Sequence, residues 1–273
     1  MRKIYESGTG FKYEKAKANA QYDKGWRYFK GDGVTQSYDE AVKCFRMAAE
    51  LGDARAQNTY GWMLYEGLGV KKDCGEAVKW YKKAVQQRNA MGQCNLGWMF
   101  QNGFGVTKDL KEAERLYRLS AEQGCAKGQI NLGWLFMKGY GVKKDYSEAV
   151  KWFKSAANEG NINAKNKLQQ AMNDVYKSAQ YGNAEAQFDL GNIYYHGCGE
   201  RQNDAEAIKW YIKAAEQGNI DAISRLKYLN IKIPELHNAV KVDKRIGASS
   251  AQGSGCLIPM IILICIMGVL YFF

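Results

Sequence analysis

Residues 54–85 read ARAQNTYGWMLYEGLGVKKDCGEAVKWYKKAV, and this stretch decides the fold. Its first part, residues 54–66, places apolar and small residues at helical spacing and has no helix breaker except Gly61, so it predicts a helix. A glycine inside a helix costs about 1 kcal/mol relative to alanine. We therefore expect a neighbouring helix to approach closely at Gly61.

The second part of the stretch predicts a reversal and a second helix. Gly67 and Gly69 permit the positive φ angles that a tight turn requires. Asp73 and Glu76 then have capping-box spacing, in which the Asp accepts backbone N–H groups and the Glu reaches back to the cap. The same spacing marks four further helix starts, at Ser37 with Glu40, Asp109 with Glu112, Asp145 with Glu148, and Asn203 with Glu206. The sequence thus predicts helical hairpins.

This unit recurs with a period of 36 residues. One column holds Gly25, Gly61, Gly97 and Gly133, followed by Gly191. Another holds the aromatic residues Phe45, Tyr81, Tyr117, Phe153 and Tyr211. The interval before Gly191 is one period plus 22 residues, and we interpret the surplus as a condensed repeat near residues 161–182 that lacks the glycine loop. Residues 16–229 are therefore predicted to hold five full repeats and a condensed one, after an N-terminal segment of residues 1–15.

Composition excludes several classes of function. The formal charge is +11, but the lysines are scattered along the chain, so we expect no nucleic-acid partner. The seven cysteines are irregularly spaced without a CxxC pair, which favours reduced thiols over a disulfide framework. The two histidines are His196 and His237, and no HExxH, Walker or GxSxG motif occurs. We expect no catalytic residues, no metal site and no cofactor, and therefore a protein that is not an enzyme.

The repeat resembles the Sel-one-like repeat family, a relative of the tetratricopeptide repeat. The fourth unit carries the pattern at Leu132, Gly133, Phe136, Gly139, Gly141, Val142, Asp145, Glu148, Ala149, Trp152, Phe153, Ala156, Ala157 and Gly160. The resemblance implies an all-α solenoid, a right-handed superhelix that serves as an adaptor for a protein or peptide partner. Some cysteine-rich relatives have been described as β-lactamases, so the alternative is a repeat-containing hydrolase. This alternative is disfavoured because the cysteine pair within each repeat and any catalytic constellation are missing.

The C-terminal region is different in character. No charged residue follows Arg245, and residues 256–273 read CLIPMIILICIMGVLYFF. As a helix these residues would span about 27 Å, close to the ~30 Å of a bilayer core. We expect a transmembrane tail anchor after a linker at residues 230–255, with the repeats facing the cytosol because no secretory signal precedes them. The alternatives are an apolar helix docked on the repeats and a lipid-anchor signal.

The first helices carry the candidate partner-binding residues. The column after the repeat glycine holds Trp26, Trp62, Trp98 and Trp134. These rings point away from the hairpin partner, so they either line a concave groove or pack between repeats. By the tetratricopeptide resemblance the concave surface also receives Tyr22, Asn58, Cys94, Ile130 and Phe188, and Phe29, Tyr65, Gln101, Met137 and Tyr195. Such an aromatic surface suits the binding of a peptide.

Overall fold

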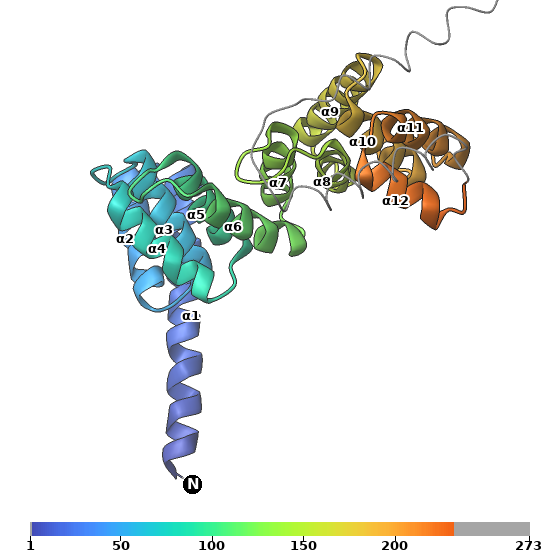
Figure 1. Cartoon of the computed structure of the whole chain (residues 1–273). Helices are drawn as coiled ribbons and strands as arrows, with labels where there is room; N and C mark the ends of the chain where they lie inside the picture. Colours follow the sequence, from blue (N-terminus) through green and yellow to red (C-terminus); the bar gives the residue numbers. More distant parts are fainter. Residues whose placement is uncertain (1, 232–273) are drawn as a thin grey trace, which may run out of the picture. The chain divides into compact units, whose positions relative to one another are not determined.

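The computed structural model describes residues 2–231 and the side chains of residues 12–231. All regular elements in this range are helices (Figure 1), which confirms the predicted all-helical repeat solenoid. The first helices of the five hairpins are α1 (Arg2–Lys30), α3 (Ala54–Glu66), α5 (Ala90–Asn102), α7 (Ala126–Lys138) and α10 (Ala184–His196). The second helices are α2 (Tyr38–Glu50), α4 (Cys74–Gln86), α6 (Leu110–Glu122), α8 (Tyr146–Asn158) and α11 (Asp204–Glu216). The remaining two are α9 (Ile162–Gln180) and α12 (Ile220–Tyr228).

The second helices begin at the five caps that the sequence marks. Each cap side chain accepts a backbone N–H three residues on, as Asp73 does from Glu76. The return half of the capping box does not form. The cap N–H is instead donated to a carbonyl of the first helix, as from Asp73 to Leu64 at 2.9 Å. The Glu76 side chain is therefore free to pair with Lys79, and its counterparts pair in the same way.

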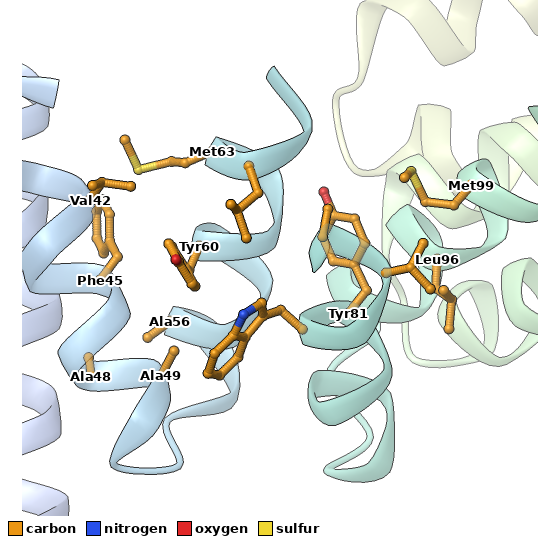
Figure 2. Packing of buried hydrophobic residues seen from close by; sticks show 14 of the residues in the cluster. Val42, Phe45, Ala48, Ala49, Ala56, Tyr60, Met63, Tyr81, Leu96 and Met99 are labelled. Atoms are coloured by element: carbon orange, nitrogen blue, oxygen red, sulfur yellow. The ribbon is translucent and has the colours of Figure 1, made fainter. Parts of the chain in front are cut away.

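Each hairpin closes around a glycine and an aromatic ring. A Cβ at Gly61 would lie only 2.9 Å from Cε1 of Tyr81, so the close approach expected from the sequence is present and requires glycine. All five aromatic residues of this column, which begins with Phe45, are buried. Between hairpins the core continues, and Figure 2 shows Phe45 of α2 facing Tyr60 of α3. One apolar cluster thus extends across the first three repeats, from Ala41 of α2 to Leu116 of α6, and such contacts between neighbours give stacked repeats their stability.

A column of buried glutamines joins the helices of neighbouring hairpins and the ends of single hairpins. The amide of Gln57 donates to the carbonyl of Ala49 in the preceding repeat, and its oxygen accepts from Gln87 at 2.9 Å. Gln93 and Gln187 accept from Gln123 and Gln217 in the same way. The fourth repeat breaks this pattern, because Glu159 occupies the position of the donor and the oxygen of Gln129 is left buried without a partner.

We expect Glu159→Gln to stabilise the protein by about 1 kcal/mol, because a buried acceptor would gain its hydrogen bond. Thermal unfolding of the variant measures the gain. Glu122→Gln is the matched control, since it makes the same change at an exposed position near the end of α6. An equal melting temperature for the two variants would contradict the explanation.

Helix α9 replaces a hairpin between the fourth and fifth repeats. The residues interpreted as a condensed repeat, 161–182, contain the whole of this single 19-residue helix. Because α9 has no hairpin partner, α10 also contacts α8 directly. An oxygen of the Asp189 carboxyl group on α10 accepts the backbone N–H of Tyr146, the first residue of α8, at 2.8 Å. The ammonium group of Lys154 on α8 donates to the carbonyl of Gly197, the C-cap of α10.

The predicted tail anchor lies outside the described residues. By its contacts the chain divides into residues 1–225, which hold the five hairpins and α9, and residues 226–273. Within residues 2–231, no helix combines the length and the apolar character needed to cross a bilayer. The expectation for residues 256–273 therefore stays an expectation.

Candidate partner-binding surface

The tryptophan column is only partly buried. Trp98 is 39% exposed, and Trp26, Trp62 and Trp134 are half-buried. Two of these rings also contact the preceding repeat. Trp62 lies 5.7 Å from Phe29, measured between ring centroids, and Nε1 of Trp98 donates to the hydroxyl of Tyr65 at 3.4 Å. These rings therefore both touch a neighbouring repeat and keep accessible area.

The second predicted column is divided between surface and core. The guanidinium of Arg55 lies 4.4 Å from the ring centroid of Tyr22, and Asn58 accepts from the amide of Asn95 at 2.8 Å. Ile130 and Phe188 are half-buried. Cys94 is fully buried, so the expected surface position is wrong there.

The third predicted column shows a similar division. Phe29, Tyr65, Gln101 and Tyr195 all keep some accessible area. Gln101 accepts from the hydroxyl of Tyr117 at 2.8 Å, which holds its side chain against the hairpin. Met137 is only 2% exposed, and the predicted surface position is wrong there too. Met137 belongs to an apolar cluster that also contains Val150 of α8 and Met172 of α9, and these two helices surround it.

Two exposed aromatic residues are not among those predicted from the sequence. Phe104 is 39% exposed and Tyr140 is 44% exposed, and each stands between the two glycines of a hairpin loop. The ring of Phe104 lies 6.0 Å from Tyr65, and that of Tyr140 lies 5.0 Å from Trp134. The sequence does contain a pattern that indicates them: the position between the paired glycines of the loop is large and apolar in three repeats, as Leu68, Phe104 and Tyr140. We call Tyr65, Trp98 and Phe104 the aromatic cluster.

Reactive groups are few in the part of the chain that the structure describes. Its five cysteines are free thiols, and burial raises the pKa of Cys94 to about 12, which keeps this thiol protonated and unreactive. Burial, and to a smaller degree Arg225, lowers the pKa of His196 below its usual range. Among the described residues no three His, Cys, Asp or Glu side chains are grouped so as to hold a metal ion.

The fold and this surface define a class: an all-helical solenoid of two-helix repeats whose first helices carry accessible aromatic side chains. Comparison with protein families places the chain within that class. It belongs to the Sel1 repeat family, whose model matches residues 18–53, 54–89, 90–125, 126–161 and 184–219, more than half of the chain. The family resemblance seen in the sequence is confirmed. Helix α9 falls in the interval between the fourth and fifth matches.

Solved structures support the family. The chain is similar to a Sel1 repeat protein from Oxalobacter formigenes, with 30% identity, a TM-score of 0.50, and coverage of 90% of this chain and 88% of the other. It is also similar to c5321, a protective antigen of uropathogenic Escherichia coli strains that displays an SLR fold, with 34% identity and a TM-score of 0.52. That match covers 80% of this chain and 50% of the antigen.

Curated relatives match over short segments. The putative sel1-like repeat-containing protein L18 of Acanthamoeba polyphaga mimivirus is 41% identical over 46 residues, 17% of this chain and 8% of the relative. The DAP3-binding cell death enhancer 1 of Mus musculus is 38% identical over 61 residues, 22% of this chain and 12% of the relative. The chain therefore spans about a tenth of the length of these relatives. Proteins with Sel1 repeats generally mediate protein–protein interactions and are typically non-catalytic.

Proposed function

We propose that this protein is a membrane-anchored scaffold that binds a protein or peptide partner on its first helices. The observation that carries the proposal is the exposure of the aromatic cluster, in which Trp98 and Phe104 of the third repeat each keep 39% of their area accessible beside the half-buried Tyr65 of the second repeat. Accessible aromatic side chains held rigidly at the centre of a surface are typical binding hot spots. The partner would pack apolar side chains against these rings, where the sequence predicts a concave groove.

We expect Trp98→Ala to weaken partner binding by about 2 kcal/mol, as for a central hot spot. The free energy of unfolding should fall by less than this, because the Trp98 ring is partly exposed and its hydrogen bond to Tyr65 is long, at 3.4 Å. Pull-down of proteins labelled by proximity in cells measures binding, and thermal unfolding measures stability.

Trp80→Ala is the control for the tryptophan test. This ring on α4 is buried against Tyr60, so its loss should cost roughly 3 to 5 kcal/mol of stability. If Trp98→Ala destabilises the protein as strongly as Trp80→Ala, the Trp98 ring is packing between repeats and the proposed binding role is wrong.

The anchoring half of the proposal rests on residues 256–273, an uncharged segment long enough to span a bilayer as a helix. We expect the full-length protein to resist carbonate extraction from membranes and a version ending at Gly255 to be released. Protease added to intact membranes should digest the repeats, because they face the cytosol. Membrane retention of the shortened version, or protection of the repeats, would contradict the anchoring.

A further inference from the structure

Cations lie over the aromatic rings of the first helices. Each of four rings from the predicted columns has one such partner, at 4.4 to 5.6 Å from its centroid. The pairs are Tyr22 with Arg55, Trp26 with Lys30, Tyr65 with Lys72, and Tyr195 with Arg225. A cation over a ring is held by the negative face of the π system, so its position is fixed beside the apolar area.

Most of these cations have no anionic partner of their own. Arg55 forms an ion pair with Asp53, but within residues 12–231 the ammonium groups of Lys30 and Lys72 and the guanidinium of Arg225 form none. Lys72 matters most, because it lies over Tyr65 in the aromatic cluster.

The two carboxylates that follow Lys72 in the sequence are occupied elsewhere. Asp73 accepts a backbone N–H as the cap of α4, and Glu76 pairs with Lys79. Glu66, the last residue of α3, forms no ion pair within residues 12–231, and neither does Asp39, whose backbone nitrogen would lie 2.7 Å from a Cβ at Gly69. Lys71 and Lys72 precede the cap together and are both exposed. This part of the surface therefore combines accessible apolar rings with a positive charge.

A ligand that complements this surface needs an apolar anchor next to a negative charge. A nucleic acid supplies negative charge, but its affinity comes from neutralising many phosphates along a basic track. Here the cations approach the rings singly, one over each ring. Complementary charge beside an apolar contact fits a peptide better.

We propose that the aromatic cluster and Lys72 bind an acidic segment of a protein that presents an aromatic or branched aliphatic side chain next to Asp or Glu. This inference rests on the proposed function, because it specifies the chemistry of the partner at the same surface. The apolar side chain packs on Trp98 and Phe104, and the adjacent carboxylate meets the ammonium group of Lys72.

A random dodecapeptide library displayed on phage tests this inference against the immobilised full-length chain in mild detergent. We expect the enriched peptides to combine Asp or Glu with an aromatic or aliphatic residue. Synthetic versions of these peptides, followed by fluorescence anisotropy, should bind more weakly as the salt concentration rises. Lys72→Glu should reduce affinity about tenfold or more, since it replaces an attraction by a repulsion. Lys82→Glu, at an exposed position on α4, is the matched control and should leave affinity unchanged.

The charge swap makes the test specific. A peptide in which the acidic residue is replaced by Lys should regain affinity for Lys72→Glu and not for the original chain. Enriched peptides that are neutral or basic, yet lose binding in Trp98→Ala, would overturn the acidic specificity and leave the binding surface intact. Enrichment of peptides whose binding is unaffected by Trp98→Ala would contradict both the acidic specificity and the proposed binding surface. Single-stranded polyuridylate binding that is lost in Lys72→Glu, without peptide enrichment, would favour a nucleic-acid ligand and overturn the inference.

Discussion

Replacing Gly105 by alanine should destabilise the protein by about 3 kcal/mol or more. Gly105 is the second glycine of the third hairpin loop and has a φ of +68°. A Cβ there would lie 2.5 Å from the carbonyl carbon of Cys74 and 2.8 Å from the backbone nitrogen of Gly75, at the start of α4 in the preceding repeat. Backbone atoms cannot rotate away as a side chain can, so the loop and the helix must separate. Urea unfolding measures the loss of stability.

Replacing Gly105 has two costs, the clash of the new Cβ with the preceding repeat and the strain of a left-handed backbone. Gly160→Ala is the control that measures the second cost alone. Gly160 has a φ of +83°, but no other atom lies within 4 Å of a Cβ built there. Its replacement therefore adds only the cost of a left-handed backbone, about 1 to 2 kcal/mol. If Gly105→Ala is no more destabilising than Gly160→Ala, the contact between the loop and the preceding repeat does not hold the hairpins together.

Replacing Asp189 by asparagine should stabilise the protein at alkaline pH. Asp189 is only 6% exposed, and burial, followed by repulsion from Asp145 and Glu185, outweighs Lys143 and the hydrogen bond from Tyr146. The pKa of Asp189 is raised to about 8. Because the folded protein holds this proton more tightly than the unfolded chain, the stability from this group is full below about pH 4 and is lost as the pH rises through 8.

Asparagine cannot lose a proton and keeps an oxygen that can accept the Tyr146 N–H. The variant should thus equal the original chain near pH 4 and exceed it by on the order of 5 kcal/mol at pH 9, since the pKa shift from 3.8 to about 8 spans about four units and each unit is worth about 1.4 kcal/mol. Unfolding free energies measured across this range check the difference. Asp221→Asn makes the same change at an exposed carboxylate near Lys143 and is the matched control. Parallel pH profiles for the original chain and Asp189→Asn would contradict the assignment.

Much of the hairpin fold could be predicted because the residues that determine each hairpin lie within that hairpin. The cap at Asp73 and the helical glycine at Gly61 act within one hairpin. Both form as expected, except that Glu76 does not reach back to the cap. The reason for Gly105 could not be predicted, because its crowding comes from the backbone of another repeat. The free oxygen of Gln129 likewise depends on Glu159, 30 residues away in a different helix.

The candidate site was harder to predict than the fold, because a column of equivalent positions does not share one environment. Tyr65 and Met137 occupy the same repeat position, yet α9 and the helices around it bury only Met137. The helical period assigned Trp98 a direction, and the structure adds that the ring both contacts Tyr65 and remains accessible. Phe104 was missed because the loop was interpreted only through its glycines.

The central claim, that first helices bind the partner, can be tested most directly by hydrogen–deuterium exchange of the full-length chain with and without the strongest library peptide. The account predicts slowed exchange in α3, α5 and the loop at residues 103–109, which together carry Tyr65, Trp98 and Phe104. Trp98→Ala should abolish this protection. Protection confined to the second helices α4 and α6, or an unchanged pattern in the presence of a bound peptide, would contradict it.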